Sequence, residues 1–236
     1  MENRKKTIGI LGGMGPLASA DLYLKIIKYS QQKYNAIQDS DYPPIIIMSL
    51  AMFGFNETGI VDEDLVKNQL VGGVKKLEAA GADFVIIACN TVHTFYKQMQ
   101  LAVKIPILNI VEETKKKVIE AGFKEVGLFS SESTNKLGLY QNSFEQCGIN
   151  VISADNSQQK LLNNVIENVM GGKQGEGDVK VLKIISDEYL KQGAEAIVMG
   201  CTEISLAISQ SQINIKLFDT TQIIAESAVD YSLVKQ

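Results

Sequence analysis

The chain alternates short apolar runs with longer segments in which apolar residues recur at helical spacing. Such runs are typical of buried strands, and such spacing is typical of amphipathic helices. Strands are predicted at residues 7–11, 45–50, 84–88, 105–110, 126–130, 150–153 and 215–218, and in the apolar run before Cys201. Helices are predicted at 17–33, 62–80, 112–121, 135–147, 158–170 and 178–192, and from 220 onward. This alternation predicts parallel sheets flanked by helices, an α/β fold.

One segment of the pattern occurs twice. Residues Gly81–Thr91 and Gly193–Glu203 each contain an acidic start, an apolar run, a small residue, a cysteine and polar residues, at a constant offset (201 − 89 = 112). The run at 126–130 likewise resembles the run at 8–12. We therefore expect two related α/β domains, the first formed by residues 1–112 plus about 214–236 and the second by 113–213.

The repeat places Cys89 and Cys201 at the carboxyl ends of two equivalent strands. Ligands bind beyond these ends in parallel sheets. Backbone N–H groups at a following helix start bind carboxylates and lower the pKa of a nearby thiol. Two like thiols suit a reaction that removes a proton from one face of a carbon and adds one to the other. The alternative is that each cysteine is a small buried apolar residue. Cys147 has no counterpart and is expected to be structural.

Two further features are open to more than one interpretation. Gly13-x-Gly15-x-x-Ala18 matches a dinucleotide-binding fingerprint, but the next strand ends without the acidic residue that binds ribose. The same loop could offer backbone N–H groups to a substrate carboxylate. His93 follows Cys89 by four residues, so it could be a general base or a surface or capping residue. A metal site is not expected, because the sequence has one histidine and no closely spaced Cys/His set.

Composition narrows the classes of protein. The 236 residues are 45% hydrophobic and 21% charged, with a net charge of −4, which predicts a soluble globular protein without a basic surface for nucleic acid. No apolar stretch reaches the roughly 18 residues of a membrane span. Three cysteines do not form a disulfide framework, so a reducing, cytoplasmic location is expected.

Three motifs together resemble the cofactor-independent aspartate/glutamate racemases, in particular the aspartate racemase branch. They are Gly12–Pro16, Ala88–His93 and Gly200–Ile204, in that order along the chain. The resemblance implies two pseudo-symmetric α/β domains with the active site in the cleft between them. It also implies a homodimer that acts on a small amino acid without pyridoxal phosphate or metal. One cysteine thiolate would remove the α-proton, and the opposite thiol would return a proton to the other face.

The resemblance also implies roles for particular residues. Cys89 and Cys201 would be the acid/base pair, with His93 as a possible auxiliary residue. The substrate-binding residues would be Met14, Asn90, Thr91, Ser131, Thr134, Lys173, Thr202 and Glu203. Ala51 and Ser131 depart from the pattern, which leaves the substrate less defined than the reaction. Three alternatives stay open: isomerisation or decarboxylation of a small carboxylic acid, a nucleotide-binding oxidoreductase, and a non-catalytic amino-acid sensor.

Overall fold

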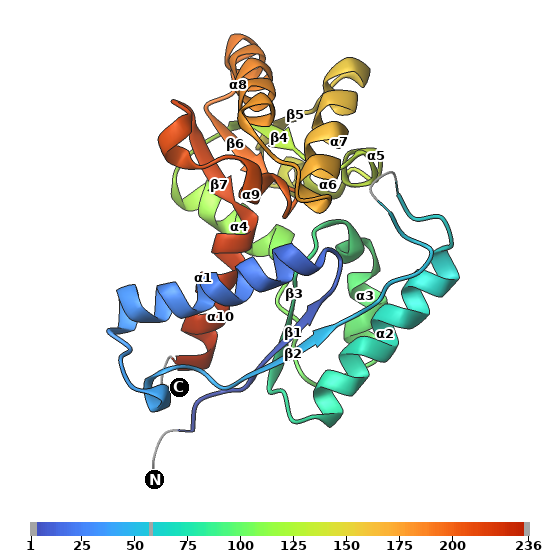
Figure 1. Ribbon diagram of the computed structural model, residues 1–236, viewed down its shortest axis with the longest axis vertical. Coiled ribbons are helices and arrows are strands. Elements are labelled where there is room, and N and C mark those ends of the chain that lie inside the picture. The colour runs from blue at the N-terminus through green and yellow to red at the C-terminus, as the bar shows by residue number, and fades with distance from the viewer. Residues whose placement is uncertain (1–3, 57–58, 234–236) are drawn as a thin grey trace. The chain divides into compact units, whose positions relative to one another are not determined.

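The described chain forms two compact units, each built around one parallel sheet (Figure 1). The computed structural model describes residues 4–56 and 59–233. The first unit comprises Met1–Gly54, Asp62–Ile110 and Thr221–Gln236, and the second comprises Phe55–Val61 and Val111–Thr220. Two parallel sheets flanked by helices confirm the predicted α/β class. Among the described helices, none is both long and apolar enough to cross a membrane.

The first unit contains a three-stranded parallel sheet in the order β2-β1-β3. Its elements are β1 (Ile8–Gly12), α1 (Pro16–Tyr34), η1 (Asp39–Asp41), β2 (Ile45–Ser49), α2 (Glu63–Ala79), β3 (Phe84–Ile87), η2 (Thr91–Phe95), α3 (Tyr96–Leu101) and α10 (Thr220–Leu233).

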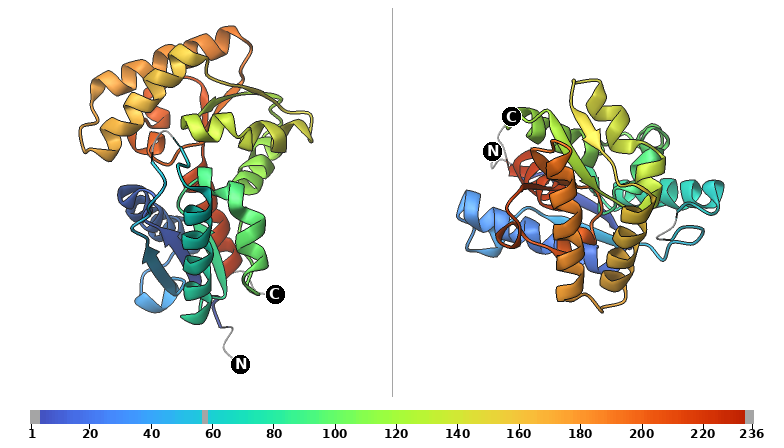
Figure 2. Two further views of the ribbon diagram at one scale, coloured as in Figure 1. Left: turned by 90° about the vertical axis from the view of Figure 1, so that its right-hand side faces the viewer. Right: turned by 90° about the horizontal axis from the view of Figure 1, so that it is seen from above.

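Helices cover both faces of this first sheet, with α2 on one side and α1 and α10 on the other (Figures 1 and 2). Gly73 of α2 packs against the side chain of Leu11 in β1. The last helix is tied to the first by the hydroxyl of Tyr34, which donates to Asp230 Oδ1 at 2.8 Å. The ring of Tyr231 also meets that of Phe84 edge-on, with centroids 4.7 Å apart.

The second unit contains a four-stranded parallel sheet in the order β5-β4-β6-β7. Its elements are α4 (Ile110–Glu120), β4 (Glu125–Phe129), α5 (Glu132–Lys136), α6 (Leu139–Glu145), β5 (Asn150–Ile152), α7 (Asn156–Met170), α8 (Glu176–Lys191), β6 (Ala196–Met199), α9 (Ile204–Ala207), η3 (Gln210–Gln212) and β7 (Lys216–Asp219).

In the core of the second unit, an aromatic side chain packs directly against a glycine of the sheet. The fully buried ring of Tyr189 in α8 lies where Gly127 of β4 has no side chain. Its hydroxyl donates to the carbonyl oxygen of Leu128 at 3.1 Å, so the buried polar group is satisfied.

The two sheets have corresponding strand orders. β1, β2 and β3 occupy the positions that β4, β5 and β6 occupy in the second sheet. The fourth position differs, because the strand predicted at 105–110 is reduced to a single bridge between Val85 and Ile107. Pro106 lacks an N–H group, and Ile110 already belongs to α4, so the pairing cannot extend.

Other expected boundaries also differ. Gly138, with φ of 61°, divides the helix expected at 135–147 into α5 and α6. The expectation assigned residues 214–236 to the first domain, but β7 pairs with β6 in the second sheet. Residues 55–61 also belong to the second unit. The sequence does not mark where β7 belongs, because pairing between segments far apart in the chain decides it.

Adjacent glycines in α2 give a matched test of this packing. A Cβ at Gly72 would meet nothing within 4 Å, whereas one at Gly73 would lie 2.6 Å from Leu11 Cδ1. Gly72→Ala should stabilise the protein by about 1 kcal/mol through helix propensity. Gly73→Ala gains the same propensity but should be less stable than Gly72→Ala by about 1–3 kcal/mol, because it overpacks the core. Urea unfolding of both variants measures the difference, and equal stability would contradict the described packing.

Candidate active site: two cysteines at equivalent strand ends

Cys89 lies two residues beyond the end of β3 in the first unit. The strand is fully buried, and the N–H of Ala88 continues its pairing by donating to the carbonyl of Leu11 at 2.9 Å. The chain then turns into the 3₁₀ helix η2. Cys89, Asn90 and Thr91 are all buried. A rigid strand end therefore holds the first candidate thiol and the two polar residues after it.

His93 is buried and contacts the backbone through both ring nitrogens. Nδ1 lies 2.9 Å from the carbonyl oxygen of Cys89, and Nε2 lies 3.3 Å from the N–H of Ile110. Burial lowers the pKa of His93 to about 4, although hydrogen bonds to the backbone at Cys89, Asn90 and Leu108 partly oppose the shift. The neutral Nδ1–H tautomer satisfies both contacts, donating to Cys89 and accepting from Ile110. To act as a base for the Cys89 thiol, the ring would have to give up one of them.

The glycine-rich loop follows β1, the neighbour of β3. Met14 is buried there, and the N–H of Gly13 donates to Ser19 Oγ at 2.9 Å. Gly13 has φ of 97°, and a Cβ at this position would lie 2.1 Å from the carbonyl oxygen of Leu50. Only glycine fits this approach, so the loop geometry explains the residue without a nucleotide.

Cys201 lies two residues beyond β6, as Cys89 does beyond β3. Its Sγ donates to Glu203 Oε2 at 3.2 Å, and Thr202 Oγ1 donates to the same oxygen at 2.9 Å. All three residues are buried. The second thiol therefore has a carboxylate as its hydrogen-bond acceptor. The spacing of the motif could have suggested this contact, but the rotamers that form it could not be predicted from the sequence.

Tyr140 lies near Cys201 and was not singled out from the sequence. Its fully buried ring packs against Gly200, where a Cβ would lie 3.0 Å from Cε2. Burial raises the pKa of Tyr140, hydrogen bonds to Thr114 and Thr220 lower it, and a thiolate at Cys201 would raise it further. The phenol therefore stays protonated. The sequence offered one signal for this contact: Gly200 stands where the first copy has Ala88, and a glycine leaves room for a neighbouring ring.

The remaining candidates belong to the second unit. Ser131 caps α5 after β4, the neighbour of β6, and its Oγ donates to Thr134 Oγ1 at 3.1 Å. Both hydroxyls are buried close to the strand-end level of Cys201. Lys173 is exposed in the turn between α7 and α8, and its N–H donates to the carbonyl of Asn168. Cys147, expected to be structural, is exposed.

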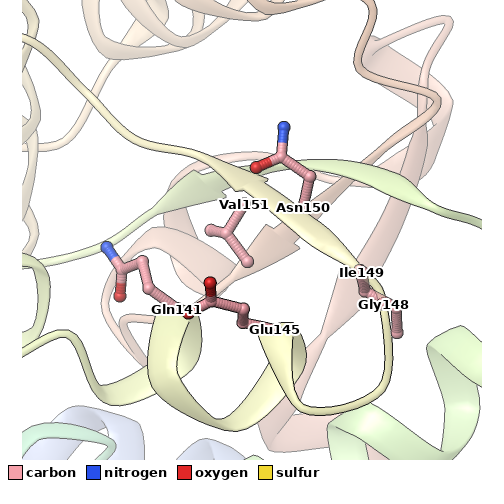
Figure 3. Close-up of a pocket in the computed structure, with 6 residues that line it drawn as sticks. All are labelled: Gln141, Glu145, Gly148, Ile149, Asn150 and Val151. Carbon is pink, nitrogen blue, oxygen red and sulfur yellow. The ribbon is translucent and has the colours of Figure 1, made fainter.

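A separate hollow of about 360 Å³ lies beside the edge strand β5. Gln141 and Glu145 project from one face of α6 toward the strand, and Asn150 points away from the helix (Figure 3). None of its lining residues is a site candidate. Within residues 4–56 and 59–233, no three His, Cys, Asp or Glu side chains are grouped so that they could hold a metal ion.

Two repeated parallel sheets with a thiol at each equivalent strand end define a class of two-cysteine α/β proteins. The family model for Asp/Glu/Hydantoin racemase matches residues 11–228. The chain therefore belongs to the Asp/Glu/hydantoin racemase family, which confirms the resemblance.

Individual relatives agree with this assignment. The chain is 33% identical over 229 residues to the broad specificity amino-acid racemase RacX of Bacillus subtilis (strain 168), which covers 97% of this chain and 99% of the relative. The aspartate racemase of Picrophilus torridus has a TM-score of 0.83 at 25% identity, over 96% of this chain and 94% of that one. PH1733, an aspartate racemase homologue from Pyrococcus horikoshii OT3, has a TM-score of 0.80 at 26% identity, over 96% and 99%.

The buried His93 should make stability depend on pH. Its pKa is about 4 in the folded protein and near 6.5 when exposed, so the unfolded state binds the proton more readily between these values. Stability should therefore fall as the pH drops from 7 to 5, by about 2 kcal/mol from this residue. His93→Gln can keep a donor and an acceptor but cannot titrate there. Urea unfolding at both pH values should show a smaller loss for His93→Gln, and equal losses would contradict the assignment.

Proposed function

We propose that this protein racemises a free α-amino acid by a two-base mechanism in which Cys89 and Cys201 exchange protons with the α-carbon. Membership of the racemase family supports the reaction class. The observation that carries the mechanism is that both thiols follow corresponding strands at the same distance. The two units thus supply like groups from like positions. The proposal requires the two thiols to reach opposite faces of one substrate carbon.

The proposed reaction breaks the bond between the α-carbon and its hydrogen. One thiolate takes the proton and becomes a thiol, while the electron pair stays on the α-carbon and spreads into the carboxylate. The second thiol then gives its proton to the opposite face and becomes a thiolate. The α-proton is far less acidic than a thiol, so fixed N–H donors must stabilise the growing charge. One such donor is typically worth about 3–4 kcal/mol.

The proposal also specifies the ionisation state of the two cysteines. In each direction one cysteine must start as a thiolate and the other as a thiol. Two thiols that act on one small substrate titrate as a coupled pair. The reaction itself then needs neither pyridoxal phosphate nor a metal ion. A homodimer in the cytoplasm, expected from the resemblance, stays a prediction.

For the substrate, we propose acidic amino acids, with aspartate first. The likeness to the Picrophilus torridus aspartate racemase supports this choice. Hydroxyl groups suited to carboxylate binding follow the strands of each unit, at Thr91, Ser131, Thr134 and Thr202.

A second candidate is broad specificity, including neutral amino acids. The 33% identity to the broad specificity racemase RacX favours it. The segment after β2 also carries the apolar residues Ala51, Met52 and Phe53, and Phe53 is 68% exposed.

Single substitutions of the two cysteines test the two-base mechanism. Cys89→Ser and Cys201→Ser should each lower racemisation by a factor on the order of 10²–10⁴, because a positioned acid or base is lost. Proton abstraction needs only one thiolate. Each variant should therefore still exchange the α-proton of one enantiomer in deuterated water, and the two variants should prefer opposite enantiomers.

Cys147→Ser is the matched control, because that thiol is exposed, and it should behave as wild type. Chiral chromatography measures racemisation, and proton NMR measures exchange. Normal racemisation by a folded Cys201→Ser protein would mean that one cysteine suffices, and the two-base proposal would be wrong.

A panel of single enantiomers decides between the two substrate proposals. With no added pyridoxal phosphate or metal, and with a chelator present, aspartate should give the highest kcat/KM, followed by glutamate. A neutral amino acid with a higher kcat/KM than both would reject the acidic preference and support broad specificity. Activity that disappears with chelator and returns with a metal ion would contradict the cofactor-free reaction.

A further inference from the structure

The repeat makes the two thiols equivalent in position but not in chemical surroundings. The offset of 112 residues pairs Cys89 with Cys201 and Thr91 with Glu203. The second copy therefore carries a carboxylate where the first carries a hydroxyl. A threonine hydroxyl is neutral and can donate or accept a hydrogen bond, whereas a carboxylate is a negatively charged acceptor. The difference lies two residues after each thiol.

The carboxylate of Glu203 accepts a hydrogen bond from the thiol of Cys201. Sγ donates to Oε2 at 3.2 Å, and Thr202 Oγ1 donates to the same oxygen at 2.9 Å. Glu203 and Cys201 are each 8% exposed, so water screens this contact weakly. Thr202 and Cys201 therefore share Oε2 as their hydrogen-bond acceptor.

A carboxylate acceptor favours the protonated form of a thiol. The S–H group donates to the anion, whereas a thiolate would place a second negative charge beside it. Ionisable groups near Cys201 include Tyr140 from α6, which stays protonated, and Asp219 of β7, which is paired in register with Met199 and whose Oδ1 accepts from Ser205. Neither supplies a positive charge that would offset the repulsion. At Cys89, the neighbouring histidine is neutral and contacts the carbonyl oxygen.

We propose that Glu203 is a positioning residue that keeps Cys201 in the thiol form, so that in the substrate-free enzyme Cys201 is the proton donor and Cys89 is the base. This inference rests on the proposed two-base function and assigns the starting state of each thiol. The enzyme then accepts first the enantiomer that presents its α-proton to Cys89. After that turnover Cys201 is a thiolate beside the carboxylate of Glu203. The repulsion between the two negative charges favours reprotonation of Cys201. Glu203 thus acts through Cys201, in place of the direct substrate contact that the resemblance implied.

The test isolates each thiol in turn and needs no substrate. Cys201 is studied in a Cys89→Ser/Cys147→Ser protein, and Cys89 in a Cys201→Ser/Cys147→Ser protein. The ultraviolet absorbance of the thiolate, followed against pH, gives the ionisation midpoint of each thiol. We expect a higher midpoint for Cys201 than for Cys89. Adding Glu203→Gln, which keeps an acceptor oxygen but removes the charge, should lower the Cys201 midpoint by about one pH unit, a tenfold change in the ionisation constant.

Glu145→Gln is the matched control, because it removes an exposed carboxylate from the same unit, and it should leave the midpoint unchanged. Glu203→Asp keeps the charge and should retain a raised midpoint, which separates the charge from any loss of folding. An unchanged or higher Cys201 midpoint in Glu203→Gln would overturn the inference, as would a lower midpoint for Cys201 than for Cys89. Racemisation by the wild-type protein is measured separately, so failure of the proposed function is distinguishable from failure of this assignment.

Discussion

The arrangement of candidate residues depends on one constraint, the common direction of all strands within each sheet. Parallel strands place every carboxyl end on the same edge. In the first sheet this edge receives the turn after β1 and Cys89 after β3, and in the second it receives Ser131 after β4 and Cys201 after β6. Helices bury both faces, so the edge is where polar side chains can gather without disrupting the core. The chemistry of each unit follows from this direction.

At the carboxyl edge of the first sheet, the buried side chains of His93 and Ser19 make hydrogen bonds to nearby backbone groups. His93 connects the carbonyl of Cys89 to the N–H of Ile110, and Ser19 accepts from Gly13 and donates to the carbonyl of Gly15. Each contact replaces one that water would otherwise make, and an unpaired buried group would cost about 1–3 kcal/mol. The backbone at the end of β3 and in the loop after β1 is therefore held by hydrogen bonds to buried side chains.

The sequence predicted the alternating fold and the two cysteine positions, because periodicity and repetition are local properties of the chain. It did not predict which segments complete each sheet. Residues 105–110 have strand composition but form one bridge, and the strand near 216 joins the second sheet. These outcomes depend on pairing between segments far apart in sequence. The contact between Cys201 and Glu203 was missed for a different reason, since side chains two residues apart meet only when the surrounding core fixes both rotamers.

The first unit is discontinuous in sequence, and this has a consequence for synthesis in the cell. Its sheet strands come from the first 87 residues, but two of its early residues make hydrogen bonds to the last helix. The backbone of Lys6 donates to and accepts from Ser232, and the hydroxyl of Tyr34 donates to Asp230. The second unit is nearly contiguous, from Val111 to Thr220. Domains fold as their residues emerge from the ribosome. The later-made unit can therefore close while the earlier-made one still lacks its last helix, and a chain truncated before α10 would leave only α1 on the face of the first sheet that the two helices share.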